Sequence, residues 1–159
     1  MGATVLSAGL LLFRCKNAGV EVLLVHPGGP FFARKDEGVW TIPKGLVETA
    51  AGEDPLLAAQ RELREETGFT AEGEFIPLGE LRQPSGKIVV AWAVEQDADA
   101  TQITSNTFSM EWPPKSGRQQ EFPEVDRAGW FTLAEARVKI LKGQAGFLDR
   151  LVKRLSLAN

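Results

Sequence analysis

The chain has 159 residues, a length that suits one globular domain able to bury a core without disulfide bonds. With 43% apolar residues, 25% charged residues and a net charge of −3, the composition argues against a disordered chain, a membrane protein and a global cationic field for nucleic acid. We therefore expect a single domain over residues 1–159, in which any anionic substrate is bound by local groups.

The single cysteine, Cys15, cannot form an intramolecular disulfide, and the chain shows no secretory pattern at its start. We expect a cytoplasmic protein in which Cys15 is a small buried core residue. The apolar stretch 3–13 is too short, and too interrupted by Gly and Ser, to cross a membrane. It is typical of a buried strand.

Apolar runs predict strands at residues 5–13 and 20–25, paired antiparallel through the turn-forming sequence Lys16–Gly19. A long charged loop follows and leads to the sequence Trp-Thr-Ile-Pro-Lys-Gly at residues 40–45. Beyond it, Asp54 suits a helix N-cap, Pro55 the first helical position and Gly68 the C-terminal stop. These start and stop signals predict a helix over residues 55–67.

Further strands are expected at residues 75–81 and 87–94, joined by a hairpin turn. The polar segment 96–121 is irregular, although residues around 107–111 suit a strand. A final strand is expected at 125–131, then a helix from the N-cap Thr132 through residue 140 and a closing helix over 145–155. This order of elements predicts a mixed sheet with helices packed on its faces.

The predicted helix 55–67 carries a cluster of three acids. Glu62, Glu65 and Glu66 stand at i, i+3 and i+4, so their carboxylates share one helix face. Like charges at this spacing destabilise a helix by roughly 0.2–0.5 kcal/mol per pair. A hard cation such as Mg²⁺, which prefers oxygen ligands, would compensate. The alternative is a solvated acidic face with Arg61 and Arg64 as salt-bridge partners.

The surroundings of this cluster favour the metal site. The stretch from Gly45 to Phe69 resembles the Nudix box of MutT-like hydrolases, Gly-x5-Glu-x7-Arg-Glu-U-x-Glu-Glu-x-Gly-U with U apolar. Every position from Glu53 to Phe69 fits. One departure exists, because seven residues separate Gly45 from Glu53, as though two had been inserted between Glu48 and Gly52. A looser resemblance extends to residues 40–44, 124 and 130.

The resemblance implies an α+β fold, an α/β/α sandwich in which a mixed sheet lies between helices and carries a loop-helix-loop motif. It also implies metal binding by Glu62, Glu65 and Glu66, joined by the backbone carbonyl of Gly45. Mg²⁺ is the expected cofactor, with Mn²⁺ as a possible substitute. Arg61 and Glu53 would pair to hold the loop against the helix.

The implied chemistry is attack of water on one phosphorus of a diphosphate linkage, supported by metal ions. A general base must accept the proton of that water. Within the box Glu66 is the first candidate and Glu65 the second. Outside it Glu124 is the best candidate, with Glu121 as its neighbour, and a plain surface charge is the alternative for both.

Several residues are candidates for substrate binding. Lys44 adjoins Gly45 and suits a phosphate contact, whereas Arg34 and Lys35, like Lys115 and Arg118, are cations that more often serve solubility. Trp40 is a candidate for stacking on a base, as are Phe31, Phe32 and Trp112, although aromatic residues beside strands are more often core. The only histidine, His26, is expected in a loop or core rather than in catalysis.

The sequence around residues 40–48 is similar to that of Nudix enzymes acting on dinucleoside polyphosphates or diphosphoinositol polyphosphates. Our first expectation is therefore hydrolysis of a dinucleoside polyphosphate such as diadenosine tetraphosphate. The alternatives are a nucleoside triphosphate pyrophosphatase that clears damaged nucleotides, a hydrolase of adenosine diphosphate sugars, and a nucleotide-sensing module without activity. We expect no stable binding to nucleic acid or membrane, and a monomer or a homodimer with residues 112–114 at the contact.

Overall fold

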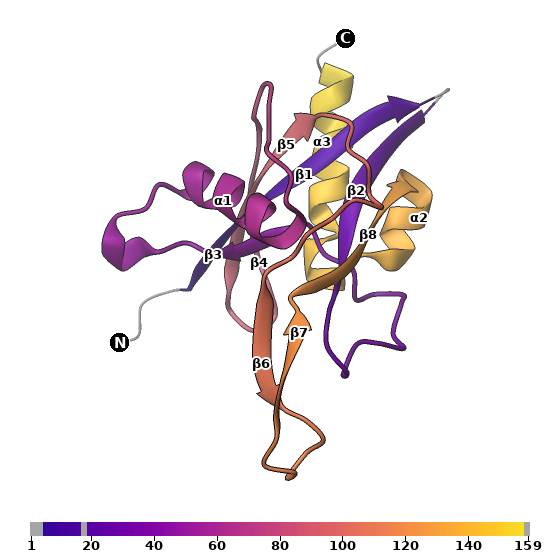
Figure 1. The fold of residues 1–159 in the computed structure, drawn as a ribbon. Helices are drawn as coiled ribbons and strands as arrows, with labels where there is room; N and C mark the ends of the chain where they lie inside the picture. Colours follow the sequence, from indigo (N-terminus) through magenta and orange to yellow (C-terminus); the bar gives the residue numbers. More distant parts are fainter. Residues whose placement is uncertain (1–4, 17–18, 158–159) are drawn as a thin grey trace.

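A mixed sheet forms the centre of the computed structural model, which describes residues 5–16 and 19–157 (Figure 1). The strands follow the spatial order β4 (Ile76–Arg82), β5 (Ile88–Glu95), β1 (Leu6–Lys16), β2 (Gly19–Pro27) and β8 (Val125–Thr132), and β3 (Lys44–Leu46) pairs with the first part of β1. Strand β1 pairs in parallel with β5 and antiparallel with β2 and β3.

Helices cover both faces of this sheet, because side chains alternate between the two faces of a strand. On one face Leu10 and Leu12 of β1 pack with buried residues of α1 (Pro55–Thr67). On the other, Leu11 and Phe13 pack against α2 (Leu133–Lys139) and α3 (Gly146–Leu157). This arrangement confirms the predicted sandwich with a mixed sheet.

The segment that precedes α1 contains a short 3-10 helix, η1 (Thr49–Ala51), which ends at Gly52 with a φ of 74°. A second one, η2 (Lys142–Gln144), precedes α3. Element η1 lies within the stretch where the motif carries two extra residues. The insertion is therefore accommodated as a local turn that ends in the left-handed conformation glycine favours, and α1 keeps the predicted bounds.

A separate hairpin of β6 (Thr107–Glu111) and β7 (Gln119–Pro123) extends away from the main sheet, beside the connection between β2 and β3 (Figure 1). Its base is held tightly. The backbone N–H of Gly28 donates to the carbonyl of Glu124 at 2.9 Å. A Cβ on Gly28 would lie 1.9 Å from the carbonyl oxygen of Pro123, so only glycine allows this approach.

The predicted elements fall close to the observed ones. The strands expected at 75–81 and 87–94 each begin and end one residue later, and the antiparallel pairing of β1 with β2 is confirmed. The central residues of its predicted turn, Asn17 and Ala18, lie outside the described residues. Strands β3 and β7 were not predicted: β3 has only three residues, and β7 begins Gln-Gln-Glu without apolar alternation.

The expected burial of Cys15 is wrong, because its side chain is exposed. The buried run of β1 ends at Phe13, and the strand continues beyond the core through residues 14–16. Cys15 therefore lies on a projecting strand end, where its neighbours are partly or fully exposed.

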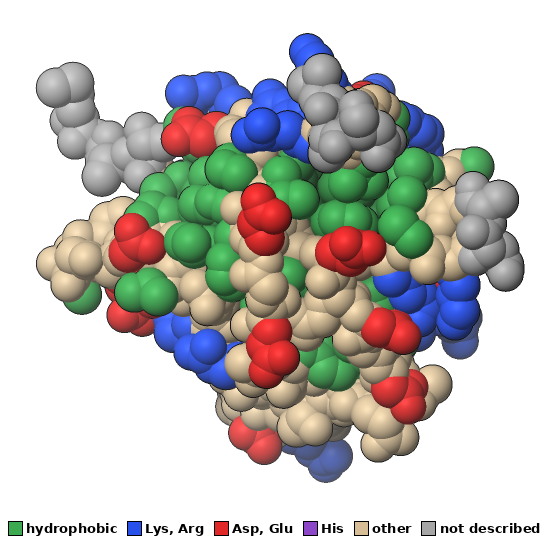
Figure 2. Space-filling model, turned by 90° about the horizontal axis from the view of Figure 1, so that it is seen from above, with side chains coloured by type: hydrophobic (Ala, Val, Ile, Leu, Met, Phe, Trp, Pro, Cys, Tyr) green, Lys and Arg blue, Asp and Glu red, His purple; other side chains and the backbone are tan. Residues whose placement is uncertain are grey.

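None of the helices in the described part of the chain has the length and apolar character needed to cross a membrane. Figure 2 views the molecule from above and shows hydrophobic side chains gathered across the middle of that face. Separate acidic side chains lie among and below them, and Lys and Arg side chains lie mainly toward the edges. The visible part of this face thus carries its cations dispersed rather than as one central patch.

Candidate active site

Helix α1 is oriented by its caps and by its buried side. The Asp54 carboxylate accepts bonds from the backbone N–H groups of Leu56 and Leu57 at 3.1 and 3.3 Å, and Gly68 closes the helix with a φ of 83°. These two ends satisfy backbone groups that a helix leaves unpaired. The buried positions, which turn the acidic side away from the core, are Ala58, Ala59, Leu63 and Thr67.

The acidic side of α1 opens into a pocket of about 370 Å³. Four carboxylates line it: three come from the helix, and the fourth belongs to Glu124, the residue between β7 and β8. A single lysine, Lys44, faces them. The lining residues are Lys44, Gly45, Leu46, Glu62, Glu65, Glu66, Asn106, Thr107 and Glu124.

Gly45 gives the pocket its closest contact between strand and helix. A Cβ at this position would lie 2.0 Å from the carboxyl carbon of Glu62 and 2.1 Å from one of its oxygens. Any side chain would therefore displace the Glu62 carboxylate. The glycine allows that carboxylate to lie directly against the backbone of β3.

Arg61 ties the preceding loop to the helix. Its Nε and Nη2 donate to the two carboxylate oxygens of Glu53 at 2.8 and 3.0 Å, and Nη2 also donates to the carbonyl of Leu46 at 3.0 Å. This arrangement confirms the expected pairing of Arg61 with Glu53. The Arg61 guanidinium, helped by the backbone N–H of Glu48, lowers the pKa of the Glu53 carboxyl to about 2.

The carboxylates of the pocket are electrostatically strained. Burial raises the pKa of Glu66 to about 8, with Glu62 and Glu124 adding to the rise and Lys44 opposing it. Burial, together with the charge of Glu65, also raises the pKa of Glu62. A pocket that disfavours its own negative charge in this way favours a bound cation.

The donor set fits a hard divalent cation. It consists of carboxylate oxygens beside the backbone of Gly45, the ligand chemistry that Mg²⁺ and Mn²⁺ prefer. Among residues 5–16 and 19–157, no three acidic, His or Cys side chains already converge as a finished metal site. Arg61 Nη1 donates to Glu62 at 2.8 Å and to Glu65 at 3.1 Å, so both carboxylates are paired with this guanidinium.

The connection between β5 and β6 brings further groups to the pocket. The backbone N–H of Asn106 donates to the carbonyl of Glu65 at 2.8 Å, and that of Glu124 donates to the carbonyl of Asn106 at 2.8 Å. The C-terminal end of α1 thus positions Asn106, Thr107 and Glu124. Asn106 and Thr107 were missed by sequence reasoning, since an irregular polar segment gives no local signal of long-range pairing.

The structure places Trp40 away from the pocket, which contradicts its expected role in substrate binding. Its side chain is only 4% exposed and packs in the core on the α2 and α3 face, against Phe131 and His26. Its Nε1 donates to Asp36 at 2.8 Å. His26 is buried as expected, with Nδ1 2.8 Å from Asp126 and Nε2 2.7 Å from the Lys35 carbonyl.

Three other candidates also lie outside the pocket. Arg34 and Lys35 are exposed on the connection between β2 and β3, and neither lines the acidic pocket. The Lys35 ammonium lies 5.6 Å from the centre of the Phe32 ring. Glu121 is exposed and accepts a long 3.4 Å bond from the Thr107 hydroxyl. Of the predicted substrate-binding residues, only Lys44 is therefore brought to the carboxylates.

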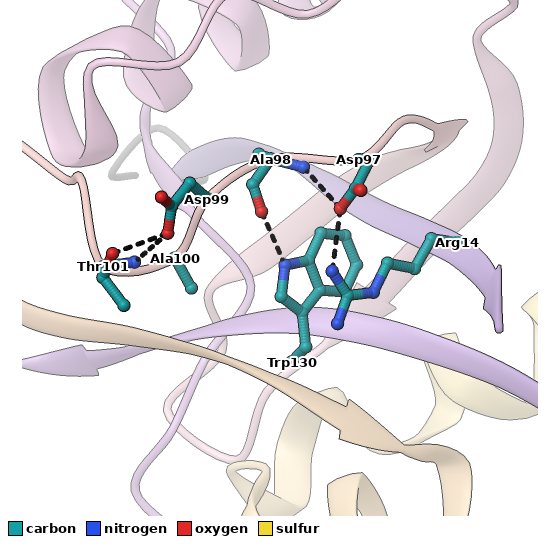
Figure 3. Close-up of a pocket in the computed structure, with 7 residues that line it drawn as sticks. All are labelled: Arg14, Asp97, Ala98, Asp99, Ala100, Thr101 and Trp130. Carbon is teal, nitrogen blue, oxygen red and sulfur yellow. Dashed lines mark hydrogen bonds and ion pairs between the residues drawn. The ribbon is translucent and has the colours of Figure 1, made fainter.

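A second pocket, of about 530 Å³, lies elsewhere and contains none of the motif residues (Figure 3). The Arg14 guanidinium stacks 4.2 Å from the centre of the Trp130 ring and donates to Asp97 at 2.8 Å. Trp130 Nε1 donates to the carbonyl of Ala98 at 2.8 Å. Because these groups satisfy one another, we assign the pocket to anchoring the start of the β5–β6 connection.

The fold and the pocket together define a class of protein: a helix-covered mixed sheet in which a loop and one helix present a carboxylate cluster. The family model described as the NUDIX domain matches residues 3–151. The chain belongs to this family, whose members generally use divalent metal ions.

Among curated relatives, the chain is 30% identical over 112 residues to an ADP-ribose pyrophosphatase from Mycobacterium tuberculosis. The match covers 67% of this chain but only 45% of that relative, so the chain spans less than half of the relative's length.

Solved structures with the same fold include a C. elegans Ap4A hydrolase in a binary complex, with 24% identity, a TM-score of 0.66 and coverage of 94% of this chain and 98% of that one. The NUDIX domain of Shewanella oneidensis NrtR, solved with ADP ribose, has 20% identity, a TM-score of 0.67 and coverage of 98% and 90%. At these identities the likeness concerns the fold.

Proposed function

We propose that this chain is a metal-dependent pyrophosphohydrolase that cuts the diphosphate linkage between a nucleoside and a further group. The observation that carries the proposal is that Glu62, Glu65 and Glu66 line one pocket together with Glu124 and Lys44. A solvated acidic helix face would need neither the close approach at Gly45 nor a fourth carboxylate from another segment of the chain.

Each residue then has a distinct task. Glu62, Glu65 and Glu66, with the Gly45 carbonyl, would hold Mg²⁺ or Mn²⁺, and the ion would neutralise charge on the diphosphate and lower the pKa of the attacking water. Lys44 would contact a phosphate oxygen. Arg61 and Glu53 are positioning residues, since their paired charges fix the loop against the helix.

Three glutamates are candidates for the general base that accepts the proton of the attacking water. Glu66 and Glu65 are candidates within the motif, but a carboxylate that binds a cation is a weaker base. Glu124 is exposed and lines the pocket from a segment outside α1, which suits a group that accepts a proton from water. We therefore favour Glu124 as the general base.

For the substrate, we propose first a dinucleoside polyphosphate such as diadenosine tetraphosphate, supported by the similar fold of the Ap4A hydrolase. The second candidate is ADP-ribose, because the curated relative is an ADP-ribose pyrophosphatase. Both contain a diphosphate linkage flanked by a nucleoside and another group, so the same carboxylate pocket serves either. We propose a single domain acting on these small molecules in the cytoplasm.

A substrate panel tests the proposal. Purified protein is incubated with Mg²⁺ and, separately, diadenosine tetraphosphate, ADP-ribose, nucleoside triphosphates, other nucleotide sugars and diphosphoinositol compounds, and products are resolved by chromatography. Turnover of either of the first two, lost on chelation, supports the assignment. Preferential turnover of nucleoside triphosphates would move it to a nucleotide-pool pyrophosphatase. Nucleotide binding without turnover of any compound would contradict hydrolysis and favour a sensor.

A further inference from the structure

Two aromatic side chains from different segments meet outside the acidic pocket. The Phe31 ring, on the connection between β2 and β3, lies 5.6 Å from the Trp112 ring at an interplanar angle of 80°. Trp112 immediately follows β6. Phe31 is 59% exposed, although it belongs to a residue type that proteins bury readily. Trp112 is half-buried, so the pair presents the open Phe31 ring and part of the Trp112 ring to the solvent.

Strand β6 connects this aromatic pair directly to the carboxylate pocket. Its first residue, Thr107, lines the pocket, and Trp112 comes five positions later. At about 3.3 Å per residue, the strand separates the two places by roughly 17 Å. A nucleoside attached through several phosphates is a ligand of comparable length. One molecule with its diphosphate at the carboxylates can therefore reach the aromatic pair with its distal end.

Contacts on both sides hold the pair in place. At the base of the hairpin, a Cβ on Gly29 would lie 3.0 Å from the Phe108 ring, which shows how closely the β2–β3 connection packs on β6. At the tip, the Glu111 carboxylate accepts bonds from the backbone N–H groups of Lys115 and Gly117 at 2.9 and 3.2 Å. A preorganised aromatic surface loses less entropy when a ligand binds.

We propose that Phe31 and Trp112 form a binding site for the aromatic base at the far end of the substrate, beyond the diphosphate that is cut. This inference rests on the proposed function, because it names the part of the substrate that the hairpin receives. A planar base is the ligand that fits, since stacking on an indole or phenyl ring requires a flat π surface and tolerates different bases.

The matched variants are Trp112→Ala and Phe31→Ala, with Phe32→Ala as the control. Phe32 is an exposed aromatic residue in the same connection, but its ring is paired with Lys35. Two readouts are compared for each protein: calorimetric binding of a non-hydrolysable methylene analogue of diadenosine tetraphosphate, and KM and kcat for diadenosine tetraphosphate and for inorganic triphosphate, which has no base.

Loss of one stacking ring should weaken binding of the analogue, and raise KM for the dinucleotide, by about 5- to 100-fold. For Trp112→Ala and Phe31→Ala, kcat for the dinucleotide and both kinetic constants for triphosphate should stay within twofold of the wild-type values. For Phe32→Ala, every measured quantity should stay within twofold of wild type. Unchanged analogue binding in both Trp112→Ala and Phe31→Ala would overturn the inference, as would equal losses in the Phe32 control. If the wild-type protein bound the analogue without turning over any substrate, and the two variants bound it more weakly, the base site would be supported and the proposed hydrolysis contradicted.

Discussion

Gly45 has no space for a side chain, because the Glu62 carboxylate packs directly against it. An added methyl group would lie 2.0 Å from the carboxyl carbon of Glu62, so Gly45→Ala must push that carboxylate out of place. We expect the affinity for Mg²⁺ and the value of kcat/KM each to fall at least tenfold, as calorimetric titration and steady-state assays would measure.

Gly19→Ala is the matched control for this change, since an added Cβ there meets nothing within 4 Å. It should preserve both quantities. If Gly45→Ala behaved like Gly19→Ala, the close packing of Glu62 on the backbone of β3 would have no functional role.

The assignment of Glu124 as the general base can be tested by making the same Glu→Gln substitution at Glu124 and at Glu121. Both are exposed, but only Glu124 lines the carboxylate pocket. Glu124→Gln should lower kcat by roughly 100-fold or more, the usual contribution of a general base, with little change in KM. Glu121→Gln should leave kcat within twofold. Equal activity of the two variants would place the base on α1 instead.

The residues of the site differ in how far local sequence predicts them. Glu62, Glu65 and Glu66 are predictable because helical periodicity alone places them on one face, and Arg61 and Glu53 follow from the motif. Asn106 and Thr107 are not, because backbone pairing with the end of α1 brings them in. The predicted substrate-binding role of Trp40 is wrong, since an aromatic residue beside the motif suits a ligand site and a core equally well, and this one lies in the core.

At the scale of elements, the loop before α1 depends on an ion pair whose strength varies with pH. The folded protein lowers the pKa of Glu53 from its ordinary value of 4.5 to about 2. The stabilisation that this shift represents is fully present above pH 4.5 and is lost as the pH falls toward 2. Arg61 keeps its charge throughout this range.

Glu53→Gln should therefore unfold at lower urea concentration than the wild type at pH 7. The difference between the two midpoints should shrink as the pH falls from about 4.5 to 2. Glu48→Gln is the control, because Glu48 contributes its backbone N–H, not its side chain, to this network. A midpoint difference between wild type and Glu53→Gln that stays constant down to pH 2 would contradict the assigned ion pair.

The elements themselves were predictable where their signals are local. Helix α1 matches its predicted bounds because Asp54, Pro55 and Gly68 mark both ends, and the Thr132 capping box marks the start of α2. Strand β7 could not be predicted, since its Gln-Gln-Glu start carries no apolar alternation. The segment is a strand through its pairing with β6, which local sequence does not reveal. The exposure of Cys15 likewise depends on how far β1 projects beyond the core.

At the scale of the whole molecule, the two faces of the sheet have separate tasks. Helices α2 and α3 close one face with an apolar core, which includes Trp40. The other face carries α1, whose buried side completes a second core while its acidic side stays open. The β5–β6 connection and the hairpin lie next to that acidic side. Stability and chemistry are thus largely divided between the two faces.

The most direct measurement of the central claim is hydrolysis of the best panel substrate across a Mg²⁺ titration, in wild-type protein and in Glu66→Gln. The account predicts that wild-type activity rises from zero with Mg²⁺ and saturates, whereas Glu66→Gln, with an unchanged circular dichroism spectrum, loses at least 100-fold in kcat/KM at every concentration. Wild-type activity that is independent of Mg²⁺ and Mn²⁺, or full activity in Glu66→Gln, would contradict it.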